Sequence, residues 1–233
     1  MAARRNGLVI AIDGPSGAGK STVATRLAER LGYRHIDTGA MYRATAWLIS
    51  QNGIDLSDSV QLEHFCNNLE INLNIANGTQ QVIANGLDVT DHIRSPEMSI
   101  MTSRIASLKP VREAMVRAQQ IMGQHGGVVL EGRDIGTVVF PDAELKFFLF
   151  ASPEERGRRR YLELTARGEK VSLEETIEAV VQRDRQDSQR DMGPLKQAED
   201  AIPLDSAGIT ADEVLDRMEN IFKQTIVTPE KNT

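Results

Sequence analysis

The sequence predicts an α/β protein built on a doubly wound parallel sheet. Strand-like and helix-like segments alternate along most of the 233 residues. The strand-like segments are short, continuous apolar runs, which are typical of parallel strands buried on both faces. A glycine-rich loop at residues 14–21 stands between the first apolar run and the first helical pattern. Ligands of such sheets bind at the carboxyl ends of the strands, so this loop marks the expected site.

The first strand and the first helix flank this loop. Residues 8–12 form the apolar run, and residues 20–31 carry apolar side chains at the spacing of one helix face. Gly32 follows, where a helix commonly ends in a left-handed residue. Next we expect a short strand at 33–36, a helix at 39–49 and further helical sequence at about 59–69.

A small antiparallel sheet of two or three strands is predicted at residues 69–93. Apolar residues recur there with a period of two, and Asn77-Gly78 and Asn85-Gly86 are hairpin signals. This segment interrupts the alternation of helices and strands. We therefore expect a single domain over residues 1–233, with its core at 1–62 and 104–233 and an insertion at about 63–103.

The second half of the chain returns to alternating elements. Helical sequence covers 95–122 and restarts at Pro110, a first-turn proline. Apolar strands are expected at 128–130, 145–150 and 201–204, and an amphipathic helix at 211–222. Two highly charged helices, 154–167 and 173–190, form a hairpin, and we interpret its first part, about 154–171, as a mobile helical lid.

Residues 14–21 match the phosphate-binding pattern G-x-x-x-x-G-K-[ST]. The glycines permit a tight turn whose N–H groups surround an anion, and the next helix directs its positive end at that anion. Lys20 supplies charge for the β- and γ-phosphates, and the Ser21 hydroxyl suits Mg²⁺. We predict a nucleotide triphosphate site that comprises Gly14, Pro15, Ser16, Gly17, Ala18, Gly19, Lys20, Ser21 and Thr22.

Polar clusters also follow two later strands. They are Asp37-Thr38-Gly39 and Glu131-Gly132-Arg133-Asp134. Because the carboxyl ends of parallel strands share one edge of a sheet, we expect these clusters and the loop to converge. Asp37 either orients waters on Mg²⁺ or caps the following helix, and the sequence favours neither role over the other.

The arginines outside the loop are unevenly placed. A guanidinium group can donate two parallel hydrogen bonds to one phosphate, and it neutralises charge that develops during phosphoryl transfer. The same residues also suit solvated helix faces, with ion pairs four residues apart such as Glu155–Arg159. The arginines concerned are Arg43, Arg112, Arg133, Arg156, Arg158, Arg159, Arg160, Arg183, Arg185 and Arg190.

Composition restricts the partners and the compartment. A net charge of −6 and an aromatic content of 4% argue against broad nucleic-acid binding. The single cysteine, Cys66, excludes an internal disulfide and fits a reducing compartment. No window approaches the roughly 18 apolar residues of a membrane span. We expect a cytoplasmic monomer that acts on small molecules, without a nucleic-acid or membrane partner.

Several longer segments together resemble the bacterial cytidylate kinases, which are P-loop nucleoside monophosphate kinases. The segments are 12–21, 37–43, 110–112 and 131–142, together with the R-x-x-x-D-x-x-R spacing of Arg183, Asp187 and Arg190. The resemblance covers nearly the whole chain, including the insertion. It implies transfer of the γ-phosphoryl group of ATP to CMP or dCMP with Mg²⁺. Family members often carry Asp-Ser-Gly where this chain has Asp37-Thr38-Gly39, and Thr38 keeps the hydroxyl.

The resemblance also implies a role for each matching residue. Tyr42 packs against the cytosine, and Ser103, Arg112 and Asp134 contact its edge. Thr38 lies near the acceptor nucleoside, whose phosphate is held by Ser16, Arg43, Arg133 and Arg190. Arg183 and Asp187 contact the sugar. The catalytic charges are those of Lys20, Arg133, Arg156 and Arg160, of which Arg156 and Arg160 come from the lid.

The chemistry of cytosine agrees with this assignment. An aspartate accepts a hydrogen bond from the N4 amino group, and an arginine donates to N3 or O2. Uracil has the acceptor O4 where cytosine has the N4 amino group, and the donor N3–H where cytosine has an acceptor. Binding of uracil would therefore leave buried polar groups unpaired. The acceptor phosphate attacks in line, no side chain becomes phosphorylated, and no general base is needed because that phosphate is already largely ionised.

Three other functions stay open at this point. The chain could phosphorylate UMP or a non-nucleotide alcohol. It could be a nucleotide-dependent switch or motor, for which residues 128–131 partly match an apolar strand that ends in an acidic pair. It could be a nucleic-acid-binding module built on the arginine-rich helices, which the net charge of −6 disfavours.

Overall fold

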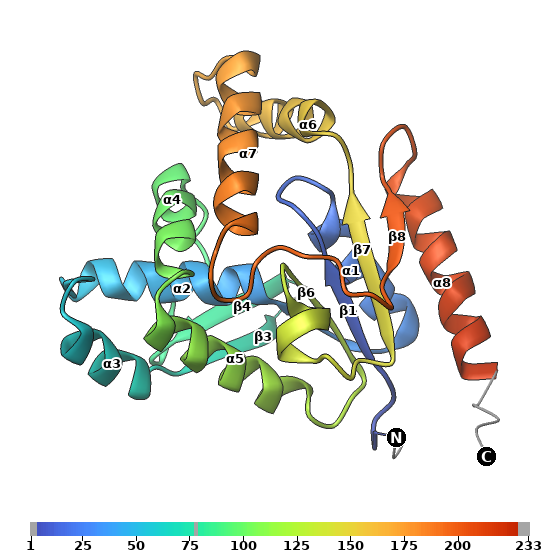
Figure 1. Cartoon of the computed structure of the whole chain (residues 1–233), viewed down its shortest axis with the longest axis horizontal. Helices are drawn as coiled ribbons and strands as arrows, with labels where there is room; N and C mark the ends of the chain where they lie inside the picture. Colours follow the sequence, from blue (N-terminus) through green and yellow to red (C-terminus); the bar gives the residue numbers. More distant parts are fainter. Residues whose placement is uncertain (1–3, 77–78, 228–233) are drawn as a thin grey trace. The chain divides into compact units, whose positions relative to one another are not determined.

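The structure, a computed structural model, describes residues 4–76 and 79–227 (Figure 1). Its main sheet has five strands in the order β2-β6-β1-β7-β8, so the predicted fold class is confirmed. Strand β1 runs parallel to both β6 and β7, and β7 runs parallel to β8. The described chain divides into two compact units.

The first unit holds the described residues up to His35, then His125–Gln189, then those from Gly193 onward. Its strands are β1 (Val9–Asp13), β6 (Val128–Gly132), β7 (Leu145–Phe150) and β8 (Ile202–Asp205). Its helices are α1 (Lys20–Leu31), α6 (Pro153–Ala166), α7 (Leu173–Ser188) and α8 (Ala211–Val227). Strand β2 (Arg34–Asp37) lies where the first unit gives way to the second.

The core of the first unit lies between the sheet and the helices α1 and α8. Ile10, Ile12 and Phe147 contribute from the strands, Leu27 from α1 and Met218 from α8, and all are almost fully buried. Burial of each such side chain contributes about 1.5–3 kcal/mol relative to exposure. The sheet is thereby held rigid directly beneath the loop that follows β1.

Helices α6 and α7 form the predicted charged hairpin beyond the end of β7 (Figure 1). Ser152 caps α6, and a capping box between Ser172 and Glu175 begins α7. Gly157 lets the two helices approach closely, because a Cβ there would lie 2.5 Å from Cγ1 of Ile177. The hairpin is therefore confirmed as a structural element, whereas its mobility stays a prediction.

The second unit comprises Ile36–Gln124 and Arg190–Met192. It contains α2 (Thr38–Gln51), α3 (Ser59–Asn67), β3 (Ile71–Ala76), β4 (Thr79–Ala84), β5 (Leu87–Asp88), α4 (Pro96–Ile105) and α5 (Lys109–Gly123). The sheet β3-β4-β5 is antiparallel, as predicted. Asn85 and Gly86 have φ of 47° and 79°, the left-handed backbone that the hairpin signal implied. The Asn77-Gly78 signal lies outside the described residues.

One element was not predicted. Residues Ile135–Val139 form a single π-helical turn, in which the Phe140 N–H donates to the Ile135 carbonyl at 2.7 Å. The turn follows directly on Arg133 and Asp134. Such turns are rare in proteins, and those that occur are often found at functional sites. No local pattern in the sequence predicts this turn.

Candidate active site

The loop between β1 and α1 has the backbone of a phosphate cradle. Gly14 and Gly17 have φ of 148° and 78°. A Cβ at Gly14 would lie 1.9 Å from the carbonyl oxygen of Leu149, so only glycine fits there. Gly19, with φ of 93°, occupies the N-cap of α1 and has no side chain to accept from the N–H groups of the first turn. The positive end of α1 is therefore left for an anion.

Lys20 lies over this loop and is almost fully buried. Its Nζ donates to the carbonyl oxygen of Pro15 at 2.7 Å. Burial lowers the pKa of Lys20 well below its usual value, and the charges of Arg133 and Arg183 lower it further against the opposing charges of Glu131 and Asp13. Three cationic side chains of the first unit therefore lie close together at the loop, an arrangement that favours a polyanion.

Ser21 is the loop residue predicted as a metal ligand. Its Oγ donates to Oε2 of Glu131 at 2.8 Å. The other carboxylate oxygen of Glu131 lies 3.1 Å from Nε2 of His35. Glu131 is buried at the end of β6, so the neighbouring strand places a carboxylate beside the Ser21 hydroxyl.

Asp13 joins β1 to the π-helical turn. Its two carboxylate oxygens accept from the N–H groups of Ile135 at 2.8 Å and Gly136 at 2.7 Å. Burial, together with a smaller effect of the Asp134 charge, raises the pKa of Asp13 to about 6 in spite of these two hydrogen bonds and Lys20, which lower it. Asp13 thus fixes the segment after Arg133 and Asp134 against the strand that carries the phosphate loop.

Arg133 and Asp134 follow β6, as predicted. Nε of Arg133 donates to Oδ2 of Asp187 on α7 at 2.8 Å. Asp187 and Asp134 are both buried. Arg183, one turn before Asp187 on α7, is the second arginine whose charge acts on Lys20. The structure therefore brings four of the predicted residues of this unit, Lys20, Arg133, Arg183 and Asp187, into one cluster.

Arg156, predicted as a lid arginine, is almost fully buried. It forms a paired ion bridge with Asp184 at 2.6 and 3.1 Å, and it also donates to the carbonyl oxygens of Ala151 and Ser16. Arg160 pairs instead with Glu163 and keeps more solvent exposure. Contact of either arginine with a transferring phosphate stays a prediction.

The second unit carries the other predicted site residues. Asp37 caps α2 by accepting from the N–H of Ala40 at 2.8 Å, and it also pairs with Arg43. The capping alternative for Asp37 is therefore observed. Thr38, Tyr42 and Arg43 lie in the first turns of α2, Ser103 lies on α4, Arg112 is buried on α5, and Arg190 follows α7. Helix α2 packs against both α4 and α5, so Tyr42, Ser103 and Arg112 come from three associated helices.

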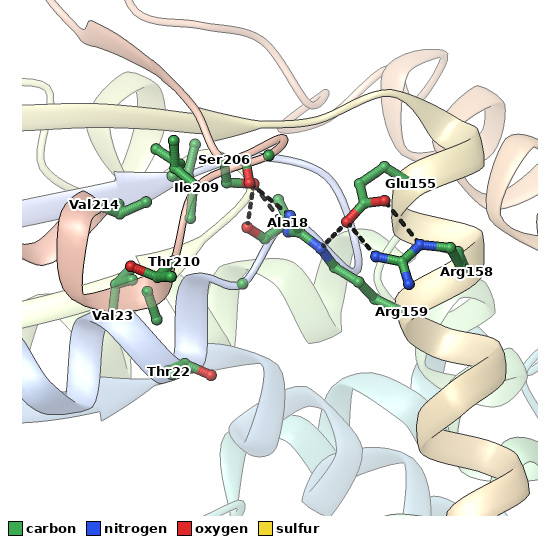
Figure 2. A pocket seen from close by; sticks show the side chains of 14 residues that line it. Ala18, Thr22, Val23, Glu155, Arg158, Arg159, Ser206, Ile209, Thr210 and Val214 are labelled. Carbon is green, nitrogen blue, oxygen red and sulfur yellow. Dashed lines mark hydrogen bonds and ion pairs between the residues drawn. The ribbon is translucent and has the colours of Figure 1, made fainter.

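A cavity of about 500 Å³ opens beside the phosphate loop in the first unit. Figure 2 shows Val23, Ile209 and Val214 on one side of it and Arg158 and Arg159 on the other. Arg159 pairs with Glu155. It also donates to two oxygens of Ser206, the hydroxyl at 3.0 Å and the carbonyl oxygen at 2.6 Å. The cavity thus has an apolar wall opposite a fixed guanidinium group.

Sequence reasoning missed several residues that build this site. Asp13, His35 and Ser206 were not among the expected site residues, and Glu131 and Arg159 were named only as members of a polar cluster and of the arginine group, without roles of their own. One signal was available for Asp13, because it is a charged residue at the ligand end of a buried strand, the same feature that pointed to the cluster of Glu131, Arg133 and Asp134. The contacts of Arg159 and Ser206 join residues 47 apart in sequence, and no local pattern predicts them.

No helix in the described part of the chain is long and apolar enough to cross a membrane.

The family model and the similar proteins of known name point to the same family, and the matches cover nearly the whole chain. The model of the cytidylate kinase family matches residues 10–224. A cytidylate kinase from Citrifermentans bemidjiense is 56% identical over 230 residues, 99% of each chain. One from Geobacter sulfurreducens is 58% identical over 223 residues, 96% of each chain. A bifunctional pantoate ligase/cytidylate kinase from Synechococcus is 51% identical over 94% of this chain and 44% of its own length. The chain belongs to the cytidylate kinase family.

Proposed function

We propose that this protein is a cytidylate kinase that transfers the γ-phosphoryl group of ATP to CMP or dCMP. The observation that carries the proposal is the cluster of positive charge at the phosphate loop, where Arg133 and Arg183 act on the buried Lys20. A polyphosphate offers the negative charge that such a cluster favours. The sequence identity of 56% and 58% to two proteins named cytidylate kinase supports CMP as the acceptor.

The ATP donor is assigned to the first unit. Its phosphates occupy the loop 14–22, where N–H groups and Lys20 bind them. Its adenosine occupies the adjoining cavity, between the apolar side chains of Val23, Ile209 and Val214 and the guanidinium group of Arg159. About 500 Å³ lies within the range of small-ligand and cofactor sites. A planar base between an apolar wall and an arginine gains both burial and a cation–π contact.

Mg²⁺ is assigned to the Ser21 hydroxyl. The donor set fits a hard cation, because the Ser21 oxygen gives its hydrogen to Glu131 and keeps its lone pairs available. When bound, Mg²⁺ would neutralise charge on the β- and γ-phosphates. Asp37 stays an alternative contact through water, although its carboxylate caps α2 in this structure.

The CMP acceptor is assigned residue by residue. Tyr42 packs against the base, and Ser103, Arg112 and Asp134 bind its edge. Thr38 lies near the nucleoside. Ser16, Arg43, Arg133 and Arg190 hold the phosphate, and Arg183 and Asp187 hold the sugar. The buried state of Arg112 and Asp134 supports a role in base selection, since buried polar groups discriminate strongly between partners.

The protein's own groups act by position and charge. Lys20, Arg133, Arg156 and Arg160 stabilise the charge of the transferring group, while bound substrates are aligned for in-line attack. Closure of the α6–α7 hairpin would exclude water and limit hydrolysis of ATP. We propose further that the enzyme acts as a monomer, which size-exclusion chromatography with light scattering would test.

The test of this proposal is an ADP-release assay with CMP, dCMP, UMP, AMP and GMP as acceptors. We expect CMP and dCMP to stimulate release far more than UMP. Failure of every acceptor to stimulate ADP release would contradict the proposal. Turnover of ATP that needs no acceptor would favour a nucleotide-dependent switch instead.

A further inference from the structure

We infer that His35 is a positioning residue that, through Glu131, orients the Ser21 hydroxyl for Mg²⁺. The inference rests on the metal role proposed above for Ser21. His35 lies on β2, and its ring nitrogens lie within hydrogen-bond distance of Thr25 on α1 and Glu131 on β6. The path from His35 to Ser21 runs through Glu131, which contacts both side chains.

A continuous chain of hydrogen bonds joins His35 to the loop. Nδ1 of His35 lies 3.2 Å from Oγ1 of Thr25 on α1, and Nε2 lies 3.1 Å from Oε1 of Glu131 on β6. Oε2 of Glu131 accepts from Ser21 at 2.8 Å. The side chains of His35 and Glu131 are 11% and 6% exposed, so water competes little for these contacts. All four residues belong to the first unit.

The chemistry of the partners fixes the proton on His35. A carboxylate only accepts hydrogen bonds, so Nε2 must be the nitrogen that carries a proton toward Glu131. In the neutral ring Nδ1 then accepts from the Thr25 hydroxyl, which satisfies both nitrogens at once. The ring thereby holds one oxygen of Glu131 and leaves the other directed at Ser21.

The direction of the Ser21 hydrogen matters for a cation. A hydroxyl has one hydrogen and two lone pairs, and a metal needs a lone pair. While Glu131 takes the hydrogen, the lone pairs of Ser21 are available on the other side of the oxygen. If Glu131 rotated away, that hydrogen could turn toward the metal position. Groups one step behind a metal ligand typically change metal affinity 10- to 100-fold in this way.

A structural role for His35 would give a different result. If the ring only tied β2 to α1, its loss would lower stability and weaken nucleotide binding equally with and without the metal. If the ring orients Ser21, its loss would weaken binding only when Mg²⁺ is present. The difference between binding in Mg²⁺ and binding in EDTA therefore separates the two roles.

The experiment measures affinity for a non-hydrolysable ATP analogue by calorimetry, in excess Mg²⁺ and in EDTA. We expect His35→Leu to weaken binding in Mg²⁺ by about 10-fold and to leave binding in EDTA within about twofold. His35→Gln offers an amide N–H at a similar reach and should recover most of the loss. His125→Leu, at an exposed histidine, is the matched control and should change neither affinity.

The outcomes distinguish this inference from the proposed function. If Mg²⁺ does not strengthen binding even to the unmodified protein, the metal role of Ser21 fails. If Mg²⁺ strengthens binding to His35→Leu as much as to the unmodified protein, only the role of His35 fails. Nitrogen NMR of the unmodified protein adds a test that needs no folded His35 variant, with the His35 signal assigned by removing His64, His92 and His125 in turn. A protonated Nε2 supports the inference, and an unprotonated Nε2 overturns it.

Discussion

Replacing Asp13 by asparagine should change how stability depends on pH. The Asp13 side chain is buried at the end of β1 and accepts two N–H groups from the π-helical turn. Burial is the main reason that its pKa rises from 3.8 to about 6, with the charge of Asp134 adding to the rise. The folded protein therefore favours the neutral carboxyl more than the unfolded chain does.

The direction and magnitude of this change in stability with pH follow from the linkage between proton binding and folding. Because the folded pKa is raised, the stabilising contribution is fully present below about pH 4 and is lost as pH rises through about 6. A rise from 3.8 to about 6 corresponds to about 3 kcal/mol of unfolding free energy. Asparagine does not titrate, so Asp13→Asn should lack this loss. Its amide also places an NH₂ against one backbone N–H, a cost that is independent of pH.

The assay is urea unfolding of both proteins at a series of pH values. The unfolding free energy of Asp13→Asn minus that of the unmodified protein should rise by about 3 kcal/mol between about pH 4 and 7. Asp55→Asn is the control, because hydrogen bonds from the backbone and side chain of Ser57 lower the pKa of the exposed Asp55. That variant should lose stability relative to the unmodified protein only as pH rises to about 4, and the difference should stay constant between about pH 4 and 7. Parallel pH profiles for Asp13→Asn and the unmodified protein would refute the reasoning.

Three further predictions each concern one residue. Arg159→Ala should raise the KM for ATP by about 10-fold without changing the KM for CMP, because it removes one wall of the proposed adenosine cavity; a change in both would contradict that assignment. Asp134→Ala should reduce the preference for CMP over UMP by on the order of 10² or more in kcat/KM, and equal losses for both nucleotides would exclude its role in base selection. Gly157→Ala should cost about 1–3 kcal/mol in thermal unfolding, because its Cβ would lie 2.5 Å from Cγ1 of Ile177, and the cost should shrink in an Ile177→Ala background.

Local patterns account for the parts of the fold that could be predicted. The phosphate loop, the small antiparallel sheet and the α6–α7 hairpin each depend on residues that are close in sequence, such as the glycines of the loop and the Asn85-Gly86 turn. Their boundaries shifted by only a few residues. The predicted helical stretch 95–122 is divided into α4 and α5, with the second beginning beside Pro110.

The parts that escaped prediction depend on the order of strands in space. Glu131 reaches Ser21 across 110 residues of sequence, and Asp13 reaches Ile135 across 122, because β6 lies beside β1 in the sheet. The π-helical turn has the same origin, since the N–H groups at its start are bound by the side chain of Asp13 rather than by a local cap. A single sequence identifies which residues carry charge at strand ends, but pairing decides which of them meet.

The carbonyl groups of the phosphate loop explain why its N–H groups can face an anion. Lys20 donates to the carbonyl oxygen of Pro15 at 2.7 Å, Arg156 to that of Ser16 at 3.1 Å and Ser206 to that of Ala18 at 3.0 Å. Each bond fixes a peptide plane, and a carbonyl held by a donor on one side directs the N–H of the same plane to the other. A cradle fixed before the ligand arrives does not need to reorganise during the reaction, which is the main source of electrostatic stabilisation in enzymes. The buried position of Arg156 therefore has a function of its own, because it supports the loop from α6 whether or not it also contacts the transferring phosphate.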